Sequence, residues 1–394
     1  MKAIGRIDAI DAARGCAMIL VCLSHVRFHF DPDSTLFDFL TTVTRIATPT
    51  FLLLSGFVAA YLLRGDKGGR IGVTLVDRGL FLLLVAHLLI GLADIHRTTP
   101  FQWVFGRMSI PDAIGVALCM AVLFRRASVA GLVAIGASLC VMSWIVALTW
   151  LPQSEWALAA GRVLFNLRGA SDWLTDVALL PYLGTFLIGM AMSSHLHHAL
   201  TVGEHRVIAR RLIIIGVTAM SIAVTAAAAW YFGSDSLPAS LREPHVASLL
   251  RHTVDPRIKW PPSPSYLLFY GGTGILMAGI FFAGKPAWLV GPTVRITSVI
   301  GRASLMSFVL QDWLLFGVPH VFGFRDSTSV PFWLAYVSLA LLLVYVAALF
   351  WGNIRGNRFF TVGLRSLYRR REARTRTPAA TPAETRHYLV DGGR

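Results

Sequence analysis

The chain has 394 residues, of which 55% are hydrophobic and only 14% are charged, and its mean hydropathy is +0.62. This composition is too apolar for the surface of a soluble globular protein, so it predicts an integral membrane protein. The formal charge of +15 does not indicate nucleic-acid binding, because the basic residues lie in short loops between apolar runs and at the C-terminus. The four cysteines lie inside apolar runs without a metal-ligand spacing, so neither disulfides nor a metal site is predicted.

Apolar runs follow one another along the chain as far as residue 352. Taking about 20 apolar residues as one helical crossing, the sequence predicts about ten membrane-spanning helices, at 12–30, 43–63, 73–94, 110–124, 128–150, 176–195, 208–232, 266–284, 299–320 and 330–352. The fourth is short and the ninth contains several polar residues. We therefore expect an all-α polytopic membrane protein, with one transmembrane domain over residues 1–354.

The distribution of Lys and Arg predicts how these helices are oriented. With the N-terminus in the cytoplasm, 22 of the 36 Lys and Arg residues fall in inner segments, ten of them after residue 354. Because basic residues favour the cytoplasmic side of a membrane, we expect both termini to be cytoplasmic. Residues 355–394 are charged and rich in Pro, Thr and Ala, which predicts a disordered basic tail whose 369–371 arginine cluster rests on anionic headgroups.

The first predicted span lies within the stretch "RIDAIDAARGCAMILVCLSHVRFHF" and keeps ionisable residues inside an apolar run. On a helix, the eleven residues from Arg14 to His25 leave only about 20° of rotation and a depth difference of ~16 Å. The two side chains therefore share a face, and we expect them to look into one cavity. Asp11 precedes Arg14 by one helical turn.

Such a set is typical of a functional site, because ionisable groups are costly inside a membrane. An arginine at the membrane mouth suits a phosphorylated ligand, and a histidine suits proton transfer near neutral pH. The alternative is purely structural: Arg14 extends to the surface, Asp11 pairs with it and His25 ends the span.

Polar residues also occur in three later spans. Ser55 and Gly56 in the second span would let a neighbouring backbone approach closely. In the third, nine residues separate Arg78 from His87, which places them on opposite faces of a regular helix and predicts a packed or hydrogen-bonded His87. The ninth span holds four polar residues that need partners inside the bundle, Arg302, Ser304, Gln311 and Asp312.

The first span resembles that of membrane-bound acyltransferases, a clan that contains the acyltransferase-3 family, the periplasmic-glucan succinyltransferases and bacterial relatives of heparan-α-glucosaminide N-acetyltransferase. The shared pattern is an acidic residue, then Arg, ten residues and His, which here are Asp11, Arg14 and His25. The resemblance extends from about residue 6 to 320 through "TRIATPTFLLLSGFVAAYL", "DRGLFLLLVAHLL", "LLPYLGTFLIGMAMS", "KWPPSPSYLLFYGGTGIL" and "IGRASLMSFVLQDWLL".

The resemblance implies an enzyme of the cytoplasmic (inner) membrane that moves an acyl group from cytoplasmic acyl-CoA to an extracytoplasmic acceptor. It favours an acetyl or succinyl group and a hydroxyl or amine of a sugar, glycan or other small polar acceptor. Aromatic residues in the long loops near 151–175 and 233–265 could form the floor of such an acceptor site, although tryptophans there are also typical membrane anchors. Arg14, Arg78 and Arg70 would bind the CoA phosphates.

For His25 the resemblance implies the role of general base or acyl relay. Many relatives carry a histidine in the ninth span where this chain has Gln311, so either Gln311 or His29 could complete the mechanism. Gln311 or Ser55 could donate a hydrogen bond to the oxyanion. The predicted catalytic set consists of His25, Asp11 and Gln311. Within it, we expect Asp11 to form a salt bridge with the phosphate-binding arginines rather than to act as an acid or base.

A different class of function is also compatible with these residues. In a proton-coupled transporter, Asp11, Arg14, His25 and Asp312 would form a relay rather than a reaction centre. In a membrane scaffold or sensor, joint substitution of Arg14 and His25 would be tolerated. The sequence does not determine the acyl group, the acceptor or the oligomeric state.

Overall fold

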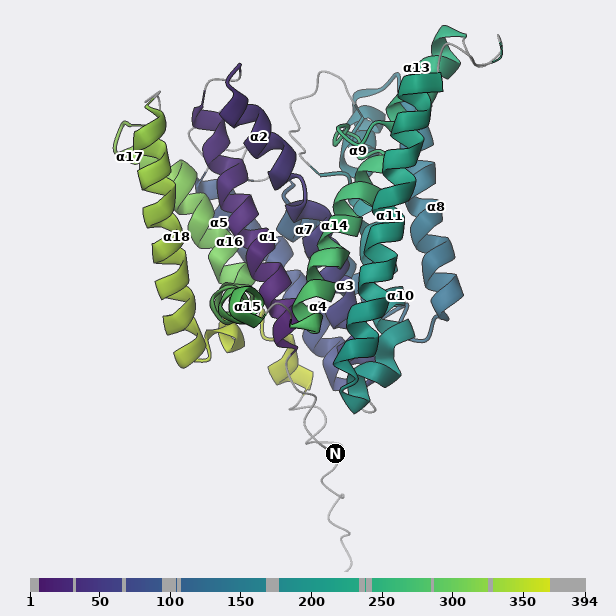
Figure 1. The fold of residues 1–394 in the computed structure, drawn as a ribbon. Helices are drawn as coiled ribbons and strands as arrows, with labels where there is room; N and C mark the ends of the chain where they lie inside the picture. The colour runs from purple at the N-terminus through teal and green to yellow at the C-terminus, as the bar shows by residue number, and fades with distance from the viewer. Residues whose placement is uncertain are drawn as a thin grey trace, which may run out of the picture.

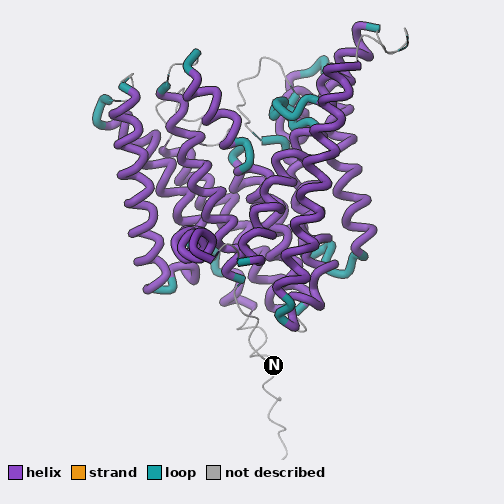
Figure 2. Tube along the Cα trace, viewed as in Figure 1, coloured by secondary structure: helices purple, strands orange, loops and turns teal. Residues whose placement is uncertain are grey.

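The computed structural model describes residues 7–30, 33–65, 69–93, 104, 108–167, 177–233, 238, 243–284, 287–324 and 329–368. Over these ranges the regular elements are helices, without a β-strand, and short loops join them mainly at two opposite ends (Figure 2). Most helices run along one common direction, so their apolar surfaces stack side by side (Figure 1). The protein is an all-α polytopic membrane protein, as the sequence predicts.

Eight helical spans in the described residues are long and apolar enough to cross a membrane. They are α1 (Asp8–Val26), α2 with α3 (Thr35–Thr44, Ala47–Arg64), α4 to α5 (Arg70–Phe81, His87–Ala93), α8 (Val129–Thr149), α10 (Leu179–Val202), α11 (His205–Gly233), α14 (Pro264–Ala283) and α18 (Val330–Asn353). α4 and α5 are joined by a π-helical turn, η2 (Leu82–Ala86).

Shorter helices complete the bundle. α7 (Ile110–Ala121) has 12 residues, and a bent pair consists of α15 (Ala287–Arg302) followed by α16 (Ser304–Asp312), η4 (Trp313–Gly317) and α17 (Val318–Val321). Outside the spans lie η1 (Arg27–His29), α9 (Glu155–Phe165), α13 (Pro244–Val254) and η5 (Gly356–Phe359). Each predicted span overlaps a helix, while the count of ten stays a prediction.

The predicted ninth span, 299–320, is wrong at its start. The helix axis bends by 76° between α15 and α16, at Ala303, whose backbone leaves the helical conformation. α15 therefore crosses the other helices and is seen end-on in Figure 1. The bend keeps Arg302 at the end of the bundle, where it pairs with Asp8, and the apolar stretch begins only at Ser304.

The centre of the bundle is formed by α3 and α10. Of the most apolar stretch of the α2–α3 span, 78% is buried, against 17% for α11, whose apolar side chains face outward as lipid contact requires. Gly56 permits the close approach of α3 and α10 that the sequence predicts, because a Cβ atom there would collide with the backbone oxygen of Phe186.

The start of α1 and the end of α18 lie at the same end of the bundle, which we call the lower face (Figure 1). The opposite end, where α2, α9 and α13 lie, is the upper face. An even number of crossings would give this arrangement, and the cytoplasmic location of both termini stays a prediction. After α18, residues 356–365 fold back onto α4, so the predicted disordered tail begins with a folded segment. Residues 369–394 lie outside the described residues.

Candidate active site

Two glycines bring α1 and α15 into backbone contact. A Cβ atom on Gly15 would collide with the backbone oxygen of Thr297, and one on Gly301 with the backbone oxygen of Asp11. Only glycine allows two helices to approach this closely. The contact fixes Asp11 and Arg14 beside the break that separates α15 from α16.

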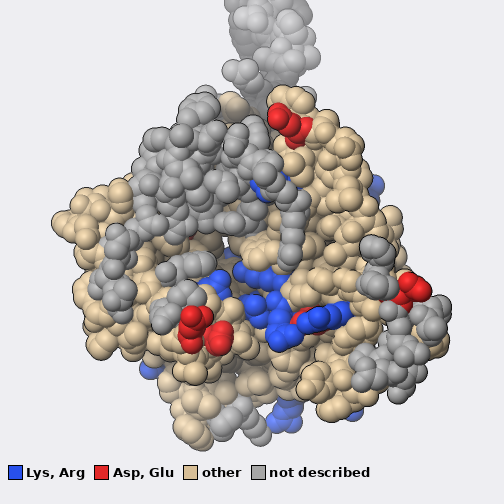
Figure 3. All heavy atoms as spheres, turned by 90° about the horizontal axis from the view of Figure 1, so that it is seen from above, with Lys and Arg blue, Asp and Glu red and all other residues tan. Residues whose placement is uncertain are grey.

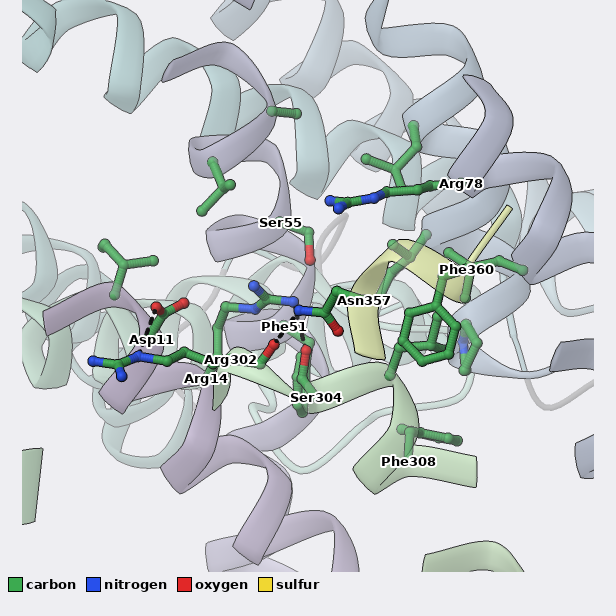
Figure 4. Close-up of a pocket in the computed structure, with 18 of the residues that line it drawn as sticks. Asp11, Arg14, Phe51, Ser55, Arg78, Arg302, Ser304, Phe308, Asn357 and Phe360 are labelled. Carbon is green, nitrogen blue, oxygen red and sulfur yellow. Dashed lines mark hydrogen bonds and ion pairs between the residues drawn. The ribbon is translucent and has the colours of Figure 1, made fainter. Parts of the chain in front are cut away.

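A cavity of ≈ 370 Å³ lies next to this crossing, between α1, α3, α4, α7 and α16. Three arginines contribute to its walls, Arg14 from α1, Arg78 from α4 and Arg302 from the end of α15. Figure 4 shows Arg14 and Arg78 approaching from opposite sides, with Ser55 of α3 between them. The rest of the lining is largely apolar, so these arginines are the groups that would attract a bound anion.

Arg14 retains hydrogen-bonding capacity inside the cavity. Its Nη2 atom donates to Ser304 Oγ at 2.6 Å, and its buried Nε atom has no hydrogen-bond partner among the described residues. A guanidinium carries five N–H donors in a plane that matches phosphate and carboxylate oxygens. Arg14 can therefore bind an anion without giving up Ser304.

Asp11 is the ion-pair partner of Arg302. Arg302 Nε lies 3.7 Å from Asp11 Oδ2, and Arg302 Nη2 donates to Asp8 Oδ1 at 2.6 Å. Asp11 lines the cavity and is not part of the His25 cluster. Arg70, in contrast, is exposed at the first residue of α4 and is not among the residues that line the cavity.

His25 belongs to a buried polar cluster with the end of α16. Its Nδ1 atom lies 2.8 Å from Gln311 Oε1 and 3.4 Å from Asp312 Oδ1. Gln311 is 0% exposed and Asp312 is 3% exposed. Because both neighbouring oxygens accept, Nδ1 is the protonated nitrogen and Nε2 carries the basic lone pair. The buried Gln311 Nε2 atom has no hydrogen-bond partner among the described residues.

The arginine cavity is not the common cavity of Arg14 and His25 that the sequence predicts. The cavity contains Arg14 but not His25, and Met18 and Phe308 contribute to its lining on the side of α1 and α16. The Phe308 ring also meets the His25 ring edge-on, with centroids 6.5 Å apart. Phe308 therefore contacts both the cavity and the His25 ring.

The other histidines near the site have separate partners. His87 Nδ1 pairs with buried Asp112 Oδ1 at 3.1 Å, as expected for a hydrogen-bonded residue. A π-helical turn lies between Arg78 and His87, so the prediction that they lie on opposite faces of a regular helix does not apply. Of the two residues, only Arg78 lines the cavity. The His29 ring stacks on Trp333 of α18 with centroids 3.6 Å apart.

Asn357 and Phe360 are cavity residues that were not predicted from the sequence. Asn357 and Phe360 lie after α18 and contribute to the same wall (Figure 4). Neither belongs to an apolar run with helical periodicity, so no pattern marked them. An indirect signal for this segment is Asp77, because a carboxylate at the membrane mouth requires a hydrogen-bonding partner from elsewhere in the chain.

A second basic region lies on the upper face. Figure 3 shows Lys and Arg side chains gathered in a central hollow of that face. Arg27 lies just after α1. Burial lowers the pKa of its guanidinium, and the positive charge of nearby Arg45 lowers it further. The Tyr266 hydroxyl donates to the Arg45 carbonyl at 3.2 Å and joins α14 to this corner. The described residues contain no group of three or more His, Cys, Asp or Glu arranged to hold a metal ion.

A comparison with known families decides the class of protein. The model of the acyltransferase-3 acyltransferase domain matches residues 7–352. The chain belongs to the acyltransferase-3 family. No curated protein and no solved structure matches it. Within this acyltransferase, the matched range contains Arg14, His25 and Gln311 but ends before Asn357 and Phe360.

Proposed function

We propose that this acyltransferase moves an acetyl or succinyl group from cytoplasmic acyl-CoA to a hydroxyl or amine of an extracytoplasmic sugar, glycan or other small polar acceptor. One observation carries the proposal: α1 presents an arginine cavity at its start and a buried histidine cluster at its end, on one face. The lower face is the cytoplasmic face, because the arginines that follow α18 and those of the tail favour that side.

Acyl-CoA carries its phosphates at one end and its reactive thioester at the other. These two ends match the arginine cavity and the His25 cluster. Arg14 and Arg78 bind the phosphates of the CoA nucleotide, and the extended pantetheine arm runs along α1 toward His25. The eleven residues between Arg14 and His25 cover ~16 Å, a distance that an extended arm can span. Phe308 must turn aside for the thioester to reach His25.

His25 then acts as the general base. Its Nε2 atom takes the proton from the acceptor hydroxyl or amine, whose oxygen or nitrogen attacks the thioester carbonyl carbon. The carbon–sulfur bond breaks, and the CoA thiolate leaves and recovers the proton from the imidazolium. Asp312 stabilises the imidazolium, and Gln311 Nε2 donates to the developing oxyanion. The hollow of the upper face gives the acceptor its route to the histidine.

The decisive experiment replaces His25 by Ala. We expect acyl transfer to fall by at least about 10²-fold, because the general base is lost, with insertion and folding unchanged. Inverted membrane vesicles supplied with labelled acyl-CoA and acceptor measure the release of CoA. His320→Ala, at the exposed end of α17, is the matched control. Near-normal turnover by His25→Ala would remove the histidine from the mechanism.

The same vesicles separate an enzyme from a proton-coupled carrier. An enzyme releases CoA only when acceptor is present, whereas a carrier leaves the thioester intact and moves a solute or protons across the membrane. Intact thioester with a proton flux that depends on His25 would favour the carrier and contradict the proposal.

The phosphate assignment has its own test. Arg14→Gln should weaken CoA binding by about tenfold or more, because it removes a buried charge-assisted contact. Titration calorimetry with CoA measures the dissociation constant, and Arg295→Gln, on the exposed side of α15, is the control. An unchanged constant for Arg14→Gln would show that the phosphates bind elsewhere.

A further inference from the structure

The segment after α18 is an integral wall of the arginine cavity. Asn357 and Phe360 both line the cavity, although they lie beyond the 7–352 range that the family model matches. In Figure 4 the Asn357 side chain lies beside Arg14 and Ser304, on the short helix η5 that precedes Phe360. The wall of the arginine cavity therefore extends past the range that the family model matches.

Asn357 braces the break that places Ser304. Its Oδ1 atom accepts from Trp351 Nε1 at 3.1 Å, and its Nδ2 atom donates to the Arg302 carbonyl at 3.0 Å. Arg302 is the last residue of α15, and Ser304, the partner of Arg14, begins α16. The amide carries two N–H donors, so one hydrogen remains for a ligand oxygen in the cavity.

Phe360 brings an aromatic ring to the same wall. The ring is held between two others, with its centroid 5.1 Å from Phe81 of α4 and 5.2 Å from Trp351 of α18. It is half-buried, and its remaining surface lines the cavity near the arginines. An aromatic surface next to guanidinium groups is a suitable environment for a purine that carries phosphates.

Asp77 anchors this segment. The carboxylate is 0% exposed and accepts four hydrogen bonds, from Thr361 Oγ1, Val362 N, Leu364 N and Arg365 Nε. All four donors belong to the segment. A buried carboxylate without such partners is strongly unfavourable, so the segment stays docked as a fixed wall rather than swinging away. Asp77 also directly precedes Arg78, which lines the cavity.

We propose that Asn357 and Phe360, in the segment after α18, are part of the donor-binding site, where Phe360 contacts the adenine ring of CoA and Asn357 positions Arg14 and Ser304 for the adjacent phosphate. This inference rests on the proposed function, because it assigns the nucleotide end of acyl-CoA to the arginine cavity. It adds a recognition element for the purine itself. A donor that lacks the nucleotide would lose this contact together with the contacts to the nucleotide phosphates, and would keep those of the pantetheine arm.

The test compares two donors in four proteins. The dissociation constants of CoA and of 4′-phosphopantetheine are measured by titration calorimetry in nanodiscs. 4′-Phosphopantetheine lacks the adenosine of CoA together with the phosphates on that adenosine. The proteins are the wild type, Phe360→Ala, Asn357→Ala and the control Phe359→Ala, whose ring is 53% exposed and is absent from the cavity lining. We expect Phe360→Ala to weaken CoA about tenfold and to leave 4′-phosphopantetheine unchanged.

Asn357→Ala should raise the KM for acyl-CoA about tenfold, with the acceptor KM unchanged, because it displaces Ser304 and Arg14. Phe359→Ala should stay within about twofold of wild type in both assays. If Phe360→Ala fails to fold, Phe360→Leu retains the packing volume but removes the aromatic face and should show the same selective loss for CoA. A loss that is equal for both donors would overturn the adenine contact.

The outcomes distinguish this inference from the proposed function. If the wild type binds neither CoA nor acyl-CoA, the proposed function is wrong, and the inference that rests on it is wrong as well. If the wild type binds CoA and all variants bind it equally well, the donor assignment stands and the role of the segment is wrong. Trypsin adds a second readout, since Asp77→Asn should expose the bonds after Arg358 and Arg365 to cleavage.

Discussion

At the scale of single residues, the pairing of His25 is the feature on which the proposed chemistry depends. A histidine in an apolar span could be a packed residue, but its Nδ1 atom faces two oxygens, at 2.8 Å and 3.4 Å. With acceptors at that position, the N–H of the neutral ring is assigned to Nδ1 and the lone pair to Nε2. The spacing on α1 predicted that His25 and Arg14 share a face, and it could not predict that Phe308 separates them.

The role of Asp312 can be tested by a substitution that preserves its shape. Asp312→Asn should lower kcat by about 10²-fold, because the neutral amide no longer stabilises the imidazolium, and should leave the donor dissociation constant unchanged. Steady-state kinetics with calorimetry of CoA binding measures both quantities. Asp255→Asn, in the loop that follows α13, is the control. Equal kcat values for wild type and Asp312→Asn would mean that His25 works without this carboxylate.

At the scale of elements, the crossing of α1 and α15 positions the arginine cavity. Hydropathy predicted α1, but residues 287–298 of α15 fall between two predicted spans. The course of α15, bent by 76° from the helix that follows it, arises from contacts between distant residues. Gly15 and Gly301 remove the side chains that would keep the helices apart. Arg302 then meets Asp8 and Asp11, and Ser304 meets Arg14.

A methyl group at this crossing should disturb the site. Gly301→Ala places a Cβ atom against the Asp11 backbone, so we expect a loss of about 1–3 kcal/mol in stability and weaker CoA binding. Thermal unfolding and calorimetry of the purified protein measure the two effects. Gly291→Ala, on the same helix, meets no atom within 4 Å and should change neither. Indistinguishable behaviour of the two variants would show that the backbone contact is not needed.

At the scale of the whole molecule, the cavity and the upper hollow lie toward opposite ends of the bundle. In the proposed function, a donor and an acceptor in different compartments reach His25 from opposite sides. α1 connects the two ends, from Asp8 at the lower face to Arg27 at the upper. This arrangement requires the lower face to be cytoplasmic, which the arginine distribution predicts.

The orientation is checked with single cysteines in a background without the four native ones. Phe359→Cys, on the lower face, should react with a membrane-impermeant maleimide only in inverted vesicles. Trp156→Cys, exposed at the upper face in α9, should react only in right-side-out vesicles. The reverse pattern would place the donor cavity outside the cytoplasm and would contradict acyl-CoA as the donor.

The sequence by itself determined the helical membrane class and the approximate location of most apolar helices, and its spacing predicts that Arg14 and His25 share a face of α1. These properties follow from hydropathy and from the 3.6-residue period, which act within one helix. Only the tertiary structure decided that Asp11 pairs with Arg302, that Gln311 and Asp312 meet His25, and that α15 turns across the bundle. It also revealed that the segment after α18 closes the cavity through Asp77. Such contacts join residues far apart in the chain, and the period of a single helix carries no information about which neighbour it will meet.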